Sequence, residues 1–250
     1  AVGETMVVPY NIVPQLDEAV AAVIVEPVAA NMGVVEPLPG FLEGLRAECD
    51  RVGAVLIFDE VITGFRLGVD GAQGRYGVTP DLTTFGKVIG GGLPIGAVGG
   101  HQAIMETLSP LGPVFHAGTL AGNPIATAAG LAALDILEPE VYEELERRAS
   151  QLASLLEDAC ASAGVPAHFP RVGTLVGAYF GNGGQVYNFD DATTTDEAAY
   201  SRFFHAMLSE GVAMAPGAYE TLFVGLGHTD SVMAALASAA QRAAVVAAQL

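Results

Sequence analysis

Two short apolar runs with a helical pattern between them constrain the fold of this chain more than any other feature. Residues 22–25 and 54–58 are apolar throughout, as expected for buried strands. Between these runs, apolar side chains recur at helical spacing, at Phe41, Leu42, Leu45 and Cys49. Gly53 can end this helix, because glycine readily adopts the left-handed conformation found after a helix C-terminus. Strand, helix and strand in this order predict a βαβ unit and an α/β fold with a parallel sheet.

The composition narrows the class of protein and its partners. With 250 residues, of which 51% are hydrophobic, the chain can bury a large core and is not disordered as a whole. Its net charge of −18 argues against nucleic acid and anionic membranes as partners. No apolar run approaches the ~18 residues of a membrane span. Cys49 and Cys160 lack the spacing of metal ligands, which favours a reducing cytoplasm without disulfides and predicts no metal site.

One lysine stands between an apolar segment and a run of glycines, within residues 81–96. Phe85 and Val88 flank Lys87, and a lysine is costly to bury unless it has a chemical purpose. A desolvated amine is a good nucleophile toward carbonyl groups, so the setting predicts covalent chemistry. For a lysine taken alone, a surface position in a flexible loop would be the more ordinary interpretation. The run matches neither phosphate-loop pattern, because Val88 follows the lysine and Ile95 replaces a third glycine.

Asp59 directly follows the second apolar run. The carboxyl ends of strands are where open α/β sheets bind ligands, although an aspartate there can also simply cap the next turn. A carboxylate at a strand end and a nucleophilic lysine further on are together what pyridoxal phosphate requires. The lysine binds the aldehyde, and the carboxylate keeps the ring nitrogen protonated. On an extended segment Val61 would share a face with Asp59 and could pack on the ring.

The later part of the chain predicts a second, smaller α/β domain. The elements expected are a long helix that ends at Gly164, a strand over 172–180, a helix over 200–210, short strands at 212–214 and 222–226, and a terminal helix over 230–249. Ahead of them, Asn123 and Pro124 can open an alanine-rich helix over 125–137. We therefore expect a partial cofactor-binding domain over 1–137 and a small C-terminal domain over 138–250.

Several segments resemble the class III aminotransferases in order and spacing. They are residues 59–66, 79–87 and 118–124. Other segments resemble, within that family, the aminomutases of glutamate-1-semialdehyde. They are residues 25–32, 87–94 and 215–220. The resemblance covers essentially the whole chain. It implies the type I fold of pyridoxal-phosphate-dependent transferases and an isomerase that converts glutamate-1-semialdehyde to 5-aminolevulinate for tetrapyrrole (porphyrin) biosynthesis.

The resemblance also implies a role for each residue of the site. Lys87 would bind the cofactor as a Schiff base and shuttle the proton, and Asp59 would bind the ring nitrogen. Val61 would pack on the face of the ring. Gly118 and Thr119 would hold the cofactor phosphate across the interface of a homodimer.

Two further residues are implied on the substrate side. Asn31 would lie near the ring hydroxyl, although a turn asparagine is nearly as good an interpretation. Glu220 would lie near the substrate, and without the matching motif a solvated carboxylate would be the better interpretation. His116 and Gly217 depart from the aminomutases, which usually carry Gln and Ser there, so an ω-aminotransferase with an external amino acceptor stays an alternative.

The beginning of the chain departs most from the family. Members carry a long N-terminal part with a phosphate loop, and none of it occurs here. The first residues also contain no starting methionine and no basic region of a signal peptide. The chain therefore resembles the C-terminal portion of a cytoplasmic enzyme, and an inactive structural fragment is the third interpretation.

Overall fold

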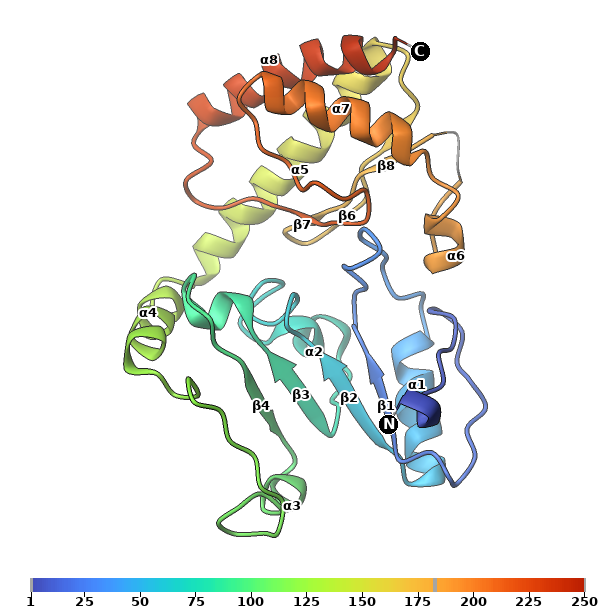
Figure 1. The fold of residues 1–250 in the computed structure, drawn as a ribbon, viewed down its shortest axis with the longest axis vertical. Coiled ribbons are helices and arrows are strands. Elements are labelled where there is room, and N and C mark those ends of the chain that lie inside the picture. The colour runs from blue at the N-terminus through green and yellow to red at the C-terminus, as the bar shows by residue number, and fades with distance from the viewer. Residues whose placement is uncertain (1, 182–183, 250) are drawn as a thin grey trace. The chain divides into compact units, whose positions relative to one another are not determined.

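The computed structural model describes residues 2–181 and 184–249 (Figure 1). The chain divides into two compact units. The sheet unit comprises Ile12–Pro27 and Pro37–Pro139, and the C-terminal unit comprises Ala1–Asn11, Val28–Glu36 and Glu140–Leu250. The division into domains at 1–137 and 138–250 stays a prediction, and the units differ from it by grouping two early segments with the C-terminal residues.

A four-stranded mixed sheet forms the centre of the sheet unit (Figure 1). Its strands are β1 (Ala22–Val25), β2 (Val55–Asp59), β3 (Leu82–Phe85) and β4 (Ala97–Gly100), in that order across the sheet. The first three run parallel, and β4 is antiparallel to β3. The helices of this unit are α1 (Phe41–Val52), α2 (Gly71–Tyr76), η2 (Lys87–Gly90), α3 (Gln102–Met105) and α4 (Pro124–Leu134). The predicted α/β fold with a βαβ unit is confirmed.

Helix α1 connects β1 to β2 and buries the face that the sequence predicts. Its buried residues are Phe41, Leu42, Leu45 and Cys49. Gly53 ends the helix in the left-handed conformation, with φ of 75°, and its N–H bonds to the carbonyl of Cys49. Leu56 and Phe58 of β2 are fully buried, and burying such side chains stabilises the fold by about 1.5–3 kcal/mol each.

Strand β1 is not the buried strand that its sequence predicts. Ile24 is 64% exposed, and Ala22 is exposed as well. Among the described residues β1 is the edge strand of the sheet and pairs with β2 alone. An apolar run therefore predicted the strand correctly but not its burial.

An ion pair joins α1 to the sheet. Arg46 Nη1 lies 2.8 Å from Asp81 Oδ2, and the N–H of Leu56 donates to the same oxygen at 2.7 Å. Burial alone would raise the pKa of Asp81, but the bonds from Arg46 and Leu56 outweigh it and hold that pKa below its ordinary value. The carboxylate thus holds together the helix, β2 and the start of β3.

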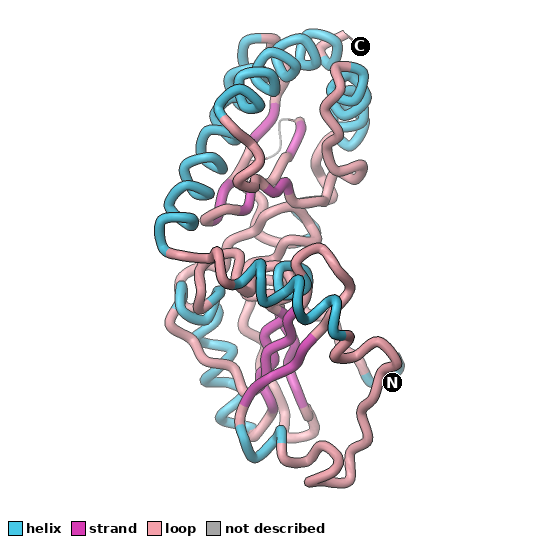
Figure 2. Tube along the Cα trace, turned by 90° about the vertical axis from the view of Figure 1, so that its left-hand side faces the viewer, coloured by secondary structure: helices cyan, strands magenta, loops and turns pink. Residues whose placement is uncertain are grey.

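The C-terminal unit contains three long helices and two small antiparallel sheets (Figure 2). Its helices are η1 (Val2–Glu4), α5 (Pro139–Ser162), α6 (Phe189–Ala192), α7 (Glu197–Ser209) and α8 (Asp230–Ala247). Its strands are β5 (Ala167–His168), β6 (Arg171–Val172), β7 (Leu175–Val176), β8 (Tyr179–Phe180) and β9 (Leu222–Phe223). α7 and α8 run side by side, and their buried faces share one core with α5.

Two of the strand predictions for this unit are wrong. Residues 172–180 do not form one strand, because Gly173 has a φ of 55° and turns the chain between β6 and β7, which pair with each other. Residues 212–214 form no strand either, and the later strand is only Leu222–Phe223. The helices are predicted better: α7 covers Glu197–Ser209 where 200–210 was expected, and α8 covers Asp230–Ala247 where 230–249 was expected. Asp196 and Thr229 cap these two helices through their side chains. None of the described helices is long and apolar enough to cross a membrane.

Candidate active site

Asp59 lies at the carboxyl end of β2, where its carboxylate is held in place from two sides. Thr84 of β3 is its partner in the sheet register, and the Thr84 hydroxyl donates to Asp59 Oδ1 at 3.2 Å. The N–H of Val61 donates to the same oxygen at 3.1 Å. Within the described chain, Oδ2 accepts no hydrogen bond. The half-buried carboxylate therefore has a fixed orientation and one oxygen available to a donor.

Val61 contacts the loop that carries Lys87, but residues 59–61 do not have the extended conformation that the sequence suggests. The bond from its N–H to Asp59 makes residues 59–61 a turn rather than an extended segment. Its side chain instead packs against Gly86, where a Cβ would lie 3.2 Å from Val61 Cγ1. Asp59, Val61 and the residue before Lys87 thus meet at one edge of the sheet.

Lys87 is the first residue of η2 and has an unusual backbone. Its φ is 48°, and the other described non-glycine residues with positive φ are Asn11 and Phe65. A residue with a Cβ in this region costs roughly 1–2 kcal/mol, and such strain clusters at functional sites. The expected burial is wrong, because the Lys87 side chain is exposed in this chain. Apolar neighbours in a turn point in different directions and do not enclose the residue between them.

The glycines after Lys87 allow η2 to touch α4. Gly91 has a φ of 56°, and a Cβ there would lie 2.3 Å from the carbonyl oxygen of Ala129. From the other side, a Cβ at Gly130 would lie 2.1 Å from the carbonyl oxygen of Ile89. Only glycine at both positions allows the two backbones to approach this closely. The loop that carries Lys87 is therefore fixed against α4.

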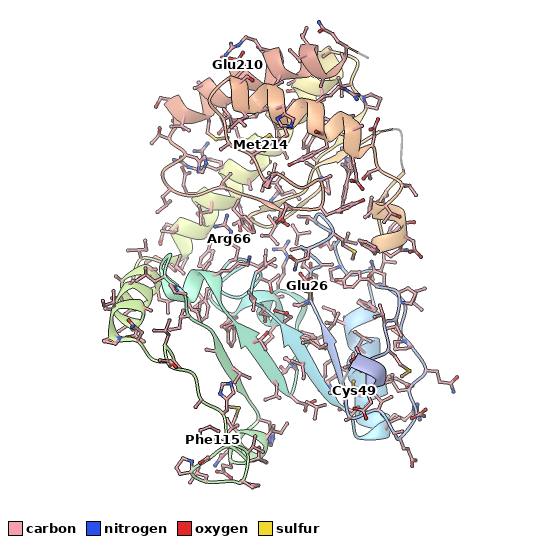
Figure 3. All side chains as sticks on the ribbon, in the orientation of Figure 1. Glu26, Cys49, Arg66, Phe115, Glu210 and Met214 are labelled. Carbon is pink, nitrogen blue, oxygen red and sulfur yellow. The ribbon has the colours of Figure 1, made fainter. Side chains whose placement is uncertain are left out.

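The segment before α4 carries the predicted phosphate-binding residues. Gly118 and Thr119 are both exposed, and within the part of the chain that the structure describes the Thr119 hydroxyl has no hydrogen-bond partner. Asn123 caps α4 as predicted, accepting from the N–H of Ile125 at 3.0 Å, but the helix ends at Leu134 rather than at residue 137. Phe115, labelled in Figure 3, lies on the same segment and is 82% exposed.

Sequence reasoning missed Glu60, the most buried carboxylate in this unit. Only 1% of the residue is exposed, and its carboxylate accepts from the Ala72 N–H at 2.6 Å and the Thr63 hydroxyl at 3.0 Å. Gln73 Nε2 donates to its other oxygen at 2.9 Å. Its position directly after β2 was the available signal, and Asp59 beside it carries the same signal. Glu60 fixes the backbone beneath Asp59 rather than facing a ligand.

Asn31 and Glu220 belong to the C-terminal unit, on two loops that contact each other. We call residues Val28–Glu36 the early loop and residues 215–221 the late loop. The N–H of Gly33 donates to the carbonyl of Tyr219 at 2.7 Å, and both predicted residues are exposed beside these contacts. The structure therefore brings Asn31 and Glu220 onto joined segments. Asp59, Val61, Lys87, Gly118 and Thr119 all belong to the sheet unit.

Two positions that depart from the aminomutases differ in their surroundings. His116 is exposed on the segment before α4. A Cβ at Gly217 would lie 3.3 Å from Glu220 Cγ, so a serine there would press on the Glu220 side chain. No group of His, Cys, Asp and Glu in the described residues could hold a metal ion.

Comparison with known proteins assigns the family. Residues 9–237 match the class III aminotransferase family. The chain belongs to this family. Its resemblance to the family at residues 59–66, 79–87 and 118–124 is thereby confirmed, and the type I fold with it.

The relatives include both activities that the sequence left open. The chain is 50% identical, over 97% of its length, to a glutamate-1-semialdehyde 2,1-aminomutase from Pelotomaculum thermopropionicum, and covers 58% of that protein. A β-phenylalanine aminotransferase from Variovorax paradoxus superposes with a TM-score of 0.81 at 33% identity, over 94% of this chain and 56% of that one. A glutamate-1-semialdehyde aminomutase from Pseudomonas aeruginosa, in complex with PMP, superposes with a TM-score of 0.81 at 27% identity. The match covers 94% of this chain and 55% of that one. The chain thus spans little more than half the length of these relatives.

Proposed function

We propose that this chain is part of a pyridoxal-phosphate-dependent aminomutase that converts glutamate-1-semialdehyde to 5-aminolevulinate for tetrapyrrole biosynthesis. The observation that carries the proposal is the sheet edge where Asp59, Val61 and Gly86, the residue before Lys87, come together, in a chain that is 50% identical to an aminomutase. The fixed carboxylate and the strained lysine supply two of the groups that this chemistry requires.

The residues present fit the cofactor. Pyridoxal phosphate, when bound, supplies an electron sink that stabilises negative charge on the substrate carbon. Asp59 Oδ2, which accepts no bond from the described residues, would hold the proton on the ring nitrogen. A charge-assisted hydrogen bond of this kind contributes about 1.5–3 kcal/mol. Thr84 and the Val61 N–H keep this carboxylate oriented before any ligand arrives.

Lys87 would have two tasks. Its Nζ would hold the aldehyde of the cofactor, and it would then move a proton to and from the substrate carbon. Both tasks need the lysine backbone at a fixed position, which the close contact of η2 with α4 provides. Because Lys87 is exposed in this chain, we expect protein outside these 250 residues to exclude water from the amine.

We also propose that Gly118 and Thr119 bind the cofactor phosphate of a second subunit in a homodimer. Both residues are exposed, and the Thr119 hydroxyl has no partner in the described chain. The neighbouring apolar side chains of Phe115 and Leu120 are 82% and 63% exposed in this chain. Such exposed apolar side chains are expected where a second subunit covers the surface. Asn31 and Glu220 would face a small-molecule substrate, and we expect the enzyme to act in the cytoplasm.

An ω-aminotransferase is the second candidate. The 34% identity to an ω-transaminase from Sphaerobacter thermophilus favours it, and so does His116, which the aminomutases usually replace with Gln. The two activities differ in the fate of the amino group. An aminomutase retains it within one substrate, whereas an aminotransferase releases a product and requires a separate amino acceptor.

The test supplies the enzyme that contains this chain with glutamate-1-semialdehyde alone. We expect 5-aminolevulinate to form over many turnovers without any keto acid or added amine. Formation that stops after one equivalent of cofactor and resumes when a keto acid is added would favour the aminotransferase. A complete lack of reaction in both conditions would favour an inactive structural fragment.

A further inference from the structure

Two buried hydrogen bonds join the early loop to the late loop. The Thr221 hydroxyl donates to the carbonyl of Ala30 at 2.9 Å, and only 4% of Thr221 is exposed. The N–H of Gly33 donates to the carbonyl of Tyr219 at 2.7 Å. These bonds lie on either side of Asn31 in the early loop and of Glu220 in the late loop. The relative position of the two predicted substrate-side residues therefore depends on them.

Tyr179 supports the early loop from beneath. Its hydroxyl donates to the carbonyl of Met32 at 2.8 Å, and burial raises the pKa of this phenol, so it remains a donor at neutral pH. Gly33 lies directly over it with a φ of 86°, where a Cβ would be 2.2 Å from the Tyr179 oxygen. Any residue other than glycine at position 33 would therefore clash with the Tyr179 side chain. Tyr179 and Met32 form a small separate core with Ala29, Val35, Val186 and Ala192.

Packing alone does not fix the late loop. Its two ends, at Ala215 and Thr221, line a cavity of about 330 Å³ together with Met214, which Figure 3 labels, and apolar residues of α5 and α7. On the α7 side, the loop is held instead by the Tyr200 hydroxyl, which donates to the Ala215 carbonyl. Ala215, Ala218 and Tyr219 of the loop pack against buried residues, but the cavity reduces this packing at the two ends, so hydrogen bonds contribute to their position.

We propose that Thr221 and Tyr179 are positioning residues that hold the early and late loops together, so that Asn31 and Glu220, the two predicted substrate-side residues, keep a fixed position relative to each other. This inference rests on the proposed function for Asn31 and Glu220. Neither Thr221 nor Tyr179 touches a reacting group, and each acts through the loop that it holds. Removing either hydroxyl loosens the pair of loops, so that Asn31 and Glu220 no longer meet the substrate together.

The experiment uses two variants that keep the shape of the side chain, Thr221→Val and Tyr179→Phe. Thr221→Ser keeps the hydroxyl that Thr221→Val removes, and it serves as the conservative variant. Ser238→Ala is the control, because it removes a similar hydroxyl-to-carbonyl bond of 3.1 Å from an exposed site on α8. Hydrogen exchange is measured by mass spectrometry on peptides that cover residues 28–36, in the whole enzyme. kcat and KM for glutamate-1-semialdehyde are measured in parallel.

We expect Thr221→Val to speed exchange in the early loop by about five- to tenfold, the factor that corresponds to the loss of one net hydrogen bond. Tyr179→Phe should have a similar effect, whereas Thr221→Ser and Ser238→Ala should exchange like the original protein. KM should rise by a similar factor in Thr221→Val and Tyr179→Phe, with a smaller change in kcat.

Unchanged exchange in both shape-conserving variants would overturn the proposal, whatever the activity. Faster exchange with an unchanged KM would overturn it too, because the loops would then have no role toward the substrate. An enzyme that never acts on glutamate-1-semialdehyde would contradict the proposed function instead, and the exchange data would still report on the coupling of the loops.

Discussion

Replacing Gly130 with alanine tests whether the contact between η2 and α4 is as close as the structure indicates. In an ordinary helix interior this change stabilises the protein by about 1 kcal/mol, because alanine has the higher helix propensity. Here the new Cβ would lie 2.1 Å from the carbonyl oxygen of Ile89, where ordinary contact begins at 3.4 Å. The two backbones must therefore separate by 1.3 Å, the difference between these distances.

The separation should more than cancel the gain in helix propensity. Overpacking costs about 1–3 kcal/mol, and the upper part of this range applies because no side chain can rotate away from a contact between two backbones. Subtracting the gain leaves a net destabilisation of about 1–2 kcal/mol. The sign of the change, rather than its size, distinguishes a close contact from a free helix surface.

Urea denaturation of the purified protein measures this change as a shift of the midpoint at constant slope. Gly99→Ala is the matched control, because a Cβ there meets nothing within 4 Å and its φ is not positive. We expect the control to change the free energy of unfolding by less than about 0.5 kcal/mol, as surface substitutions do. A Gly130→Ala protein that is more stable than the original would refute the reasoning. It would show that the loop carrying Lys87 is not fixed against α4.

Two further predictions concern single charged residues. Borohydride reduction of the cofactor-loaded enzyme, followed by peptide mapping, should place the cofactor on Lys87, and a label on any other lysine contradicts the proposed site. For Asp81, whose bonds from Arg46 and Leu56 lower its pKa, the stabilisation is present above the ordinary carboxyl pKa and is lost as pH falls through the lowered one. The stability difference between the original and Asp81→Asn should therefore shrink below about pH 4, and a difference that stays constant down to pH 2 would show that the ion pair does not stabilise the fold.

The sequence predicted the parts of the fold that depend on local patterns. The apolar runs and the spacing from Phe41 to Cys49 predicted β1, α1 and β2. Burial of one face of a helix or strand requires apolar residues at a regular spacing in the sequence. Asn123 predicted the start of α4 through its capping side chain. Asp59 could be singled out because it directly follows an apolar strand, although the turn that it caps through the Val61 N–H is also a structural reason for an aspartate there.

Features that depend on distant or backbone contacts were not predictable in this way. The positive φ of Lys87 and its exposure have no signature in the flanking apolar residues. The strand expected at 172–180 is broken by Gly173, because a glycine in an apolar run can be either a strand residue or a turn. The bonds from Tyr179 and Thr221 to the early loop were also invisible, since hydroxyl donors carry no periodicity.

The long sequence separation of those last two bonds governs when the early loop can acquire its native structure. Met32 precedes Tyr179 by 147 residues, and Ala30 precedes Thr221 by 191. At ~5–20 residues per second, a ribosome needs roughly 10–40 s to reach Thr221 after it has made Ala30. The sheet residues on both sides of the early loop are synthesised long before Tyr179 and Thr221. During synthesis the early loop therefore lacks its hydrogen bonds to these two residues. The bonds from Tyr179 and Thr221 to the early loop can therefore form only after most of the chain has been synthesised.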